Sequence, residues 1–245
     1  MEQNKSKDNV LYVKMFGSFS MIYAGESVLG NKVSETQFTY MMQILLHNRK
    51  NGVSRESLEE MLFGDRDIKN IHHTMQSVIY NAKNKLRKAG LPIANYIRME
   101  KGVFYWTDDI LVVEDAAEFD RLYKEAQEEK DINAKLQILL EACHCYTGEF
   151  LSMYAGVMWA AAEARRYREQ FCQCVEKAAE ILRDRQDYLQ LEQLGTYASS
   201  IAPFSDWESL TMEALIGMGR YEEAGSLYAE TVDRYFKERG IRPSQ

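Results

Sequence analysis

Eight basic side chains gather within residues 66–101, where only two acidic side chains accompany them. The basic residues are Arg66, Lys69, Lys83, Lys85, Arg87, Lys88, Arg98 and Lys101, and the acidic ones are Asp67 and Glu100. Eight positive charges less two negative ones leave +6 in this segment, although the whole chain carries −7. Attraction to a polyanion depends on where charge clusters rather than on the total. The segment therefore favours contact with phosphate groups, and the alternative is a solvated basic helix face.

Residues 71–89 are predicted to form a helix whose outward face carries polar groups without any acid. At 100° per residue the apolar side chains fall within about 100° of one another, the width of a buried stripe. They are Ile71, Met75, Val78, Ile79, Ala82 and Leu86. The opposite face holds His73, Ser77, Tyr80, Asn81, Asn84, Arg87 and Lys88. A solvated helix usually interleaves Glu with Lys because pairs four residues apart stabilise it, so an acid-free face suits phosphates and base edges.

A zinc site formed by cysteine and histidine side chains is a second possible chemistry, with weaker support in the sequence. Cys143-His144-Cys145 and Cys172-Gln173-Cys174 both fall in predicted helices. Helical residues two apart point about 200° from each other and cannot close on one ion, and common zinc sites space their ligands differently. We therefore expect reduced thiols and no bound metal. His72 and His73 are interpreted as a helix start near phosphate rather than as a ligand pair.

No catalytic motif is recognisable. The sequence lacks a glycine-rich phosphate loop, a Gly-x-Ser-x-Gly turn and a His-Glu-x-x-His pair, and it has four histidines in total. We expect a protein that is not an enzyme, with no catalytic residue and no cofactor.

Composition indicates a soluble protein of one or two domains. The chain has 245 residues, 46% of them hydrophobic, which is enough for one or two packed cores. Mean hydropathy is −0.42, and no stretch approaches the roughly 20 apolar residues of a membrane span. The first ten residues are polar and lack a secretory signal, and four cysteines are too few for a disulfide scaffold. We expect a reduced, cytoplasmic protein with no membrane partner.

The first half of the chain predicts strands, three helices and a hairpin. Residues 10–29 are rich in β-forming side chains and are broken into short strands near Gly17 and Ala24-Gly25. Helices are expected over residues 36–48, 54–62 and 71–89, and a hairpin over 95–106 turning at Glu100-Lys101-Gly102. This order is that of an α+β winged helix-turn-helix domain, which we place at residues 10–112 after a polar tail at 1–9.

The second half, residues 113–245, predicts an all-α array. Helices are expected at about 115–129, 131–146, 157–184, 187–201, 206–218 and 221–239. Antiparallel pairs of this length, with small residues such as Ala214, Gly217 and Ala224 at crossing points, favour tetratricopeptide-like repeats. An ordinary helical bundle is the alternative.

Several segments, in this order, resemble a known family of regulators. Val53–Gly64 resembles the second helix of OmpR/PhoB-type winged helices, Ile79–Leu86 the end of their recognition helix, and Gly102-Val103-Phe104-Tyr105 their wing. Asp115–Asp120, Tyr146–Leu151, Trp159, Gly219–Ala224 and the ending Glu238–Ser244 resemble the bacterial transcriptional activator domain. That domain follows a winged helix in the antibiotic-regulatory (SARP) family.

The resemblance implies a bacterial transcription regulator that binds tandem promoter repeats, usually as a homodimer on DNA, and helps recruit RNA polymerase. It would be cytoplasmic and associated with the nucleoid. On the recognition helix we expect base contacts from His73, Thr74, Ser77, Tyr80 and Asn81. We expect phosphate contacts from Lys69, Lys83, Asn84, Lys85, Arg87 and Lys88, and from Arg98 and Lys101 in the wing. Family members often hold Arg where Asn81 and Lys83 stand.

The main alternative is a tetratricopeptide-like protein-interaction module whose winged helix is degenerate. Residues 111–245 carry 15 basic and 25 acidic side chains, a net −10, whereas residues 1–110 carry 15 and 12, a net +3. Salt-sensitive DNA binding would distinguish the two possibilities.

Overall fold

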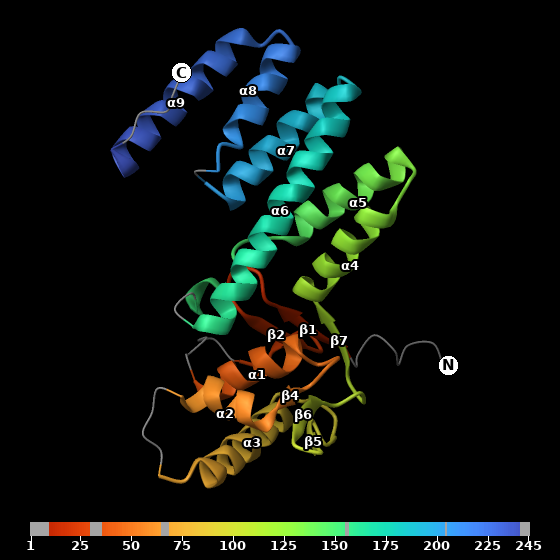
Figure 1. The fold of residues 1–245 in the computed structure, drawn as a ribbon, viewed down its shortest axis with the longest axis vertical. Helices are drawn as coiled ribbons and strands as arrows, with labels where there is room; N and C mark the ends of the chain where they lie inside the picture. Colours follow the sequence, from red (N-terminus) through yellow and green to blue (C-terminus); the bar gives the residue numbers. More distant parts are fainter. Residues whose placement is uncertain (1–9, 30–35, 65–68, 155–156, 204, 241–245) are drawn as a thin grey trace. The chain divides into compact units, whose positions relative to one another are not determined.

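The computed structural model describes residues 10–29, 36–64, 69–154, 157–203 and 205–240. The polar tail at 1–9, Arg66, Asp67 and the Ile241–Ser244 part of the C-terminal motif lie outside these residues. The chain divides into two compact units (Figure 1). The N-terminal unit comprises Met1–Glu118 with Phe150–Ala162, and the helical unit comprises Phe119–Glu149 with Glu163–Gln245.

A four-stranded sheet opens the N-terminal unit. Its strands are β1 (Val10–Lys14), β2 (Ser20–Tyr23), β3 (Glu26–Ser27) and β7 (Leu111–Glu114), in the order β3-β2-β1-β7. β1 and β2 are antiparallel, whereas β7 runs parallel to β1 with Val10 opposite Leu111. The predicted turn after β2 is present: Ala24 and Gly25 both have positive φ, 49° and 84°, the pattern of a two-residue hairpin turn.

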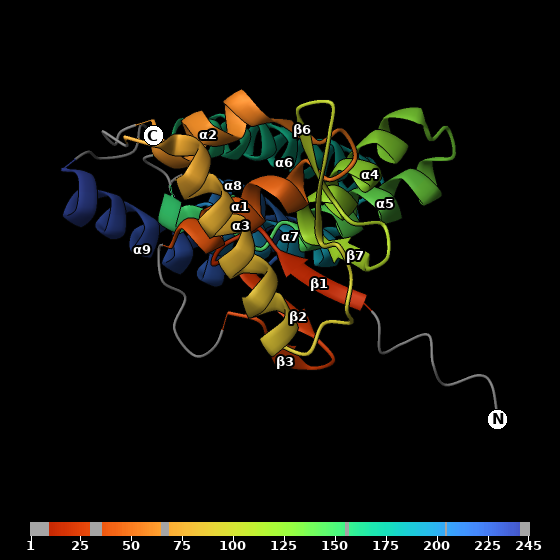
Figure 2. The ribbon, with the colours of Figure 1, turned by 90° about the horizontal axis from the view of Figure 1, so that it is seen from below.

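Three helices and a second sheet complete the same unit. The helices are α1 (Gln37–His47), α2 (Arg55–Phe63) and α3 (Ile71–Lys88). Each begins at a side chain that caps it: Thr36 accepts from the N–H of Thr39, Ser54 from that of Ser57, and Asn70 from that of His73. The second sheet has the order β4-β6-β5, from β4 (Val53–Ser54), β6 (Val103–Trp106) and β5 (Ile97–Glu100). Figure 2 shows α3 on the outer side of this unit.

The buried stripe of α3 is narrower than the sequence predicts. Met75, Val78, Ala82 and Leu86 are buried as expected. Ile79 is only half-buried, and Ile71 is 38% exposed. The prediction was wrong for Ile71 because it occupies the first helical position, beyond the reach of the core that covers the following turns.

The segment Phe150–Ala162 belongs to the N-terminal unit although it lies far along the chain. Phe150 forms an isolated antiparallel bridge with Phe16, and the N–H of Leu151 donates to the carbonyl of Met15 at 2.8 Å. A short 3₁₀ turn, η1 (Ser152–Tyr154), follows. Its Tyr154 ring meets Tyr40 of α1 edge-on, with ring centres 5.0 Å apart. This segment therefore extends the core of the N-terminal unit.

Helices α4–α9 form a helical array close to the predicted one. They are α4 (Asp115–Glu128), α5 (Ile132–Cys145), α6 (Met158–Asp184), α7 (Tyr188–Ile201), α8 (Glu208–Gly217) and α9 (Tyr221–Arg239). Small residues allow close crossings: a Cβ added at Gly195 of α7 would lie 2.6 Å from Oγ1 of Thr211 in α8. Among the helices of the described residues, none combines the length and apolar character that a membrane crossing requires.

Candidate nucleic-acid interface

The outward face of α3 collects most of the predicted contact residues. His73, Ser77, Tyr80, Asn81, Arg87 and Lys88 are exposed, whereas Thr74, Lys83 and Asn84 are half-buried. None of the 18 residues of α3 is acidic. The Tyr80 side chain, 67% exposed, stands in the middle of this face. An exposed aromatic ring surrounded by amides and cations can contact a base edge or stack against a sugar.

Two of the predicted base contacts already use their hydroxyl protons within the helix. The Oγ1 of Thr74 donates to the carbonyl of Asn70 at 3.0 Å, and the Oγ of Ser77 donates to the carbonyl of His73 at 3.1 Å. These hydroxyl oxygens are then placed to accept hydrogen bonds from a ligand. His73, Tyr80 and Asn81 are the predicted base contacts that can offer donors from the exposed face.

The predicted phosphate contacts differ in how firmly the protein itself holds them. Lys69, Arg87, Lys88 and Lys101 are exposed. The Nζ of Lys83 donates to Asn95 at 2.8 Å, and the Nζ of Lys85 lies 4.7 Å from the centre of the Phe38 ring. Arg98 is ion-paired with Asp108 at 2.7 Å and with Glu100 at 3.5 Å. These two carboxylates offset much of the positive charge that the wing would present through Arg98.

One flank of α3 faces the start of α1 across a hollow of about 380 Å³. Its lining residues are Thr36, Gln37 and Phe38 from the start of α1, and Val78, Asn81, Asn84, Lys85 and Lys88 from α3. Asn81, one of the predicted base contacts, therefore lies on the α1 side of the exposed face rather than at its centre.

On the opposite flank, the start of α2 contacts both the start of α3 and the turn between β5 and β6. In that turn Lys101 and Gly102 have φ of 49° and 81°, as a tight hairpin requires. The carbonyl of Gly102 accepts from the N–H of Arg55 at 2.8 Å. The guanidinium of Arg55 lies 2.7 Å from Nδ1 of His72. The starts of α2 and α3 and the tip of the hairpin are thus held together.

Sequence reasoning missed Arg55 and Gln76 as part of this surface. Gln76 is exposed and lies three residues after His73 and four before Tyr80, so helical spacing alone could have placed it on the outward face. Arg55 could not be found this way, because its contact with His72 joins two helices.

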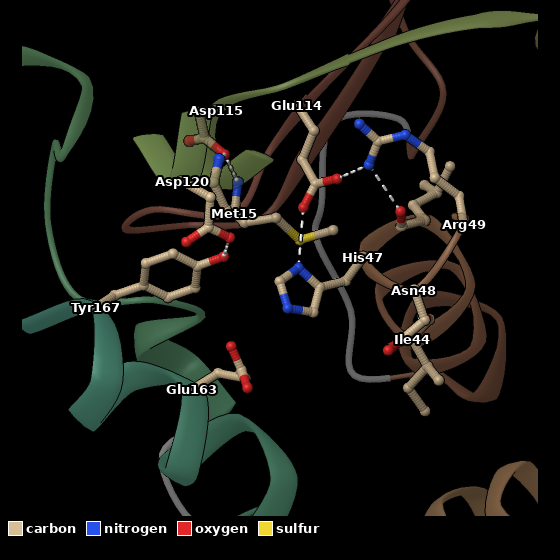
Figure 3. A network of polar contacts seen from close by, with 12 residues as sticks. Met15, Ile44, His47, Asn48, Arg49, Glu114, Asp115, Asp120, Glu163 and Tyr167 are labelled. Atoms are coloured by element: carbon tan, nitrogen blue, oxygen red, sulfur yellow. Dashed lines mark hydrogen bonds and ion pairs between the residues drawn. The ribbon is translucent and has the colours of Figure 1, made fainter. Parts of the chain in front are cut away.

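A buried ionic cluster fixes the end of β7 (Figure 3). The Glu114 carboxylate is fully buried and pairs with Arg49 and, at 3.0 Å, with Nδ1 of His47. The adjacent Asp115 accepts the N–H groups of Met15 and Phe16 at 2.7 and 3.1 Å. Burial raises the pKa of the Asp115 carboxyl to about 6, against the lowering effect of these hydrogen bonds. The cluster holds the ends of α1, β1 and β7 in one place.

The four cysteines lie on α5 and α6. Cys143 and Cys174 are buried, Cys145 and Cys172 are half-buried, and none of the four forms a disulfide. Burial raises the pKa of the Cys143 thiol well above its usual range and that of Cys174 to about 12, so both remain protonated and unreactive. Within the described part of the chain, no group of three or more His, Cys, Asp or Glu side chains could hold a metal ion.

Comparison with known proteins finds similarity to a protein family and to a solved structure. Residues 114–245 match the family described as the bacterial transcriptional activator domain. The fold is similar to that of a solved structure described as Mycobacterium tuberculosis EmbR in complex with a low-affinity phosphopeptide, with a TM-score of 0.64 and 15% sequence identity. The similarity covers 96% of this chain and 62% of the EmbR chain. No curated protein sequence matches.

Proposed function

Because this chain belongs to the bacterial transcriptional activator domain family, we propose that it regulates transcription by binding promoter DNA through α3 and the β5–β6 hairpin. The expected resemblance to SARP-like regulators is confirmed by the family match and the EmbR-like fold. The β-containing N-terminal unit would then be a winged helix of the OmpR/PhoB type, with α3 as its recognition helix.

One observation carries this proposal: the exposed face of α3 contains cations, amides and an aromatic ring but no carboxylate. Double-stranded DNA presents a dense row of phosphates, and affinity for it rests largely on cations that replace counterions. A helix fits the major groove, where polar side chains near its start reach base edges. Arg87 and Lys88 would bind phosphates, while His73, Tyr80 and Asn81 would face the bases.

The remaining features of the proposed regulator follow from the family. It would act in the bacterial cytoplasm on the nucleoid and bind direct repeats in promoters as a homodimer on DNA. The array α4–α9 would be tetratricopeptide-like and would mediate dimerisation, contact RNA polymerase or receive the signal.

A second candidate is a protein-interaction module in which the helical array binds a partner. The α9 helix favours it, because Tyr221, Tyr228 and Phe236 are large apolar side chains exposed along this helix. Exposed aromatic side chains are enriched at protein interfaces. In this reading the N-terminal unit would not bind DNA with measurable specificity.

Selection of bound sequences from randomised duplexes tests the proposal. The full chain should enrich a direct repeat spaced at about one helical turn, and binding of the enriched duplex should weaken steeply with salt. Failure to enrich any sequence, together with weak and salt-insensitive binding, would overturn the proposal and favour the interaction module.

A further inference from the structure

A chain of four polar side chains runs from α2 onto the outward face of α3. The Oε1 of Glu59 accepts from Nε of Arg55 at 2.7 Å, and the Nη2 of Arg55 lies 2.7 Å from Nδ1 of His72. The amide nitrogen Nε2 of Gln76, one helical turn beyond His72, lies 3.2 Å from Nε2 of the same ring. The Arg55 guanidinium therefore contacts Glu59 of α2 through Nε and His72 of α3 through Nη2, and these two contacts fix its position relative to α3.

The chain dictates which ring nitrogen of His72 carries the proton. Arg55 has only donors, so Nδ1 of His72 must accept from it and carries no proton. A neutral imidazole then holds its proton on Nε2, which donates. Two N–H groups would then face each other, so the Gln76 amide must be turned over, with its oxygen accepting from Nε2. The oxygen and nitrogen of an amide are told apart only by their hydrogen bonds.

A fixed amide orientation determines what Gln76 can recognise. With its oxygen turned back towards His72, the side chain presents its NH₂ group, a pure donor, away from the helix start. A freely rotating glutamine pairs with adenine, because it offers a donor to N7 and an acceptor to the N6 amino group. Guanine instead offers two acceptors in the major groove, N7 and O6.

We propose that Gln76 reads a guanine, and that Arg55 and His72 are the positioning residues that hold its amide in the donor orientation. This inference rests on the proposed function, because it needs α3 to lie in the major groove. Gln76 lies between His73 and Tyr80 on the exposed face, where a base edge would come within its reach. Exclusion of water by bound DNA would strengthen the Glu59–Arg55–His72–Gln76 chain.

The test is the base preference selected from randomised duplexes by the full chain and its variants. The wild type should select guanine at one position of the half-site, and Gln76→Ala should abolish the preference at that position alone. In His72→Phe the amide can rotate, so selection there should shift from guanine towards adenine by about fivefold or more. Arg55→Met leaves the His72 ring in place but removes the group that donates to its Nδ1, so this variant should give the same shift. The exposed His144 of α5 supplies a matched control, because His144→Phe should leave the whole profile unchanged.

Other outcomes distinguish failure of this inference from failure of the proposed function. An enriched wild-type motif that Gln76→Ala leaves intact would overturn the inference while the proposed function stands. The same holds if Gln76→Ala acts at an adenine position, or if His72→Phe and Arg55→Met both keep the guanine preference. Absence of any enriched sequence for the wild type would overturn the proposed function and this inference together.

Discussion

Individual side chains of α3 divide into those that could distinguish bases and those that could only neutralise phosphates. Asn81 is exposed and has both a donor and an acceptor. Lys101 belongs to the β5–β6 turn rather than to α3, and it has a charge and no acceptor. These two residues therefore provide opposite tests of the same interface.

Asn81→Ala should weaken binding to the selected site by about 1–3 kcal/mol and have little effect on random DNA, because a lost base contact matters only at the correct base. Titrations of the two duplexes with wild type and variant measure the difference. An equal loss on both duplexes would make Asn81 a phosphate contact.

Lys101→Ala should weaken binding to all duplexes alike and reduce the slope of log affinity against log salt by about one. The reason is that a single phosphate contact releases about one counterion. A slope identical to that of the wild type would remove the hairpin tip from the interface.

Asp115 gives the stability of the chain a pH dependence of known sign. Its pKa is raised to about 6 in the folded state from an ordinary value of 3.8. The stabilisation that the protonated carboxyl gives to the fold is therefore complete below the ordinary pKa, and it is lost as the pH rises through the raised pKa. Relative to Asp115→Asn, the wild type should lose about 2 kcal/mol of unfolding free energy between pH 4.5 and pH 7. Denaturant titrations of both proteins measure this. A constant difference across that range would show that the hydrogen bonds from Met15 and Phe16 cancel the effect of burial.

The exposed face of α3 was predictable from spacing, but the partners of its side chains were not. A period of 3.6 residues places His73, Ser77 and Tyr80 outward without further information. The pairs Lys83–Asn95 and Arg98–Asp108 join residues 12 and 10 positions apart in elements of different kinds. Such pairs depend on how elements pack, which local pattern does not specify.

At the scale of elements, local pattern predicted the helices and the hairpins, whereas non-local pairing was missed. Helices α1–α9 all lie within two residues of the ranges expected from the sequence, although α8 and α9 begin without a side-chain cap. Leu111–Glu114 became the strand β7 only because it pairs with β1, about 100 residues earlier. The turn η1 and the bridge from Phe150 to Phe16 likewise depend on contacts that the sequence pattern does not reveal.

The hairpin beside α3 depends on the absence of a side chain at Gly52. Gly52 has φ +70°, and an added Cβ would lie 2.5 Å from Cε1 of Tyr105 in β6. Gly52→Ala should therefore push β6 away and destabilise the N-terminal unit. Gly25→Ala is the matched control, because Gly25 has a similar φ of +84° but no atom within 4 Å of an added Cβ.

We expect the Gly52 variant to lose about 1–3 kcal/mol more unfolding free energy than the Gly25 variant. Denaturant unfolding of both variants measures the difference. The cost of placing alanine at positive φ is similar in the two variants, so it largely cancels. Equal losses in the two variants would mean that β6 accommodates the extra carbon without strain.

At the scale of the whole molecule, the chain passes between its two units three times. Residues Met1–Glu118 and Phe150–Ala162 form one unit, and Phe119–Glu149 and Glu163–Gln245 form the other. The family match starts at residue 114, so part of the matched region, Phe150–Ala162, is built into the N-terminal unit. Truncating the chain at the start of the family match would therefore remove part of that unit's core.

Phe150→Ala tests this division of the chain. Phe150 is buried among Phe16, His47 and Trp159, and truncating a buried phenylalanine costs about 3–5 kcal/mol. Hydrogen exchange should show lost protection for β1 and α1 in the N-terminal unit. Phe236→Ala, at an exposed position of α9, should leave these amides unchanged. Loss of protection in α7 and α8 instead, with β1 and α1 intact, would contradict the division.

Both units carry exposed cations, and this allows the most direct test. Arg87 and Lys88 are exposed on α3, whereas Lys124 and Arg165 are exposed cations of the helical unit, 78% and 83% accessible. Replacing either pair by Ala changes the net charge of the chain equally, so only the location of the charge differs.

The measurement is the affinity of the full chain for duplex DNA, at two salt concentrations, for the wild type and for the two double variants. Arg87→Ala with Lys88→Ala should weaken binding to all duplexes and reduce the salt slope by about two, while Lys124→Ala with Arg165→Ala should match the wild type. Equal affinity and slope for the wild type and the α3 variant would contradict the assignment of α3 as the DNA-binding face.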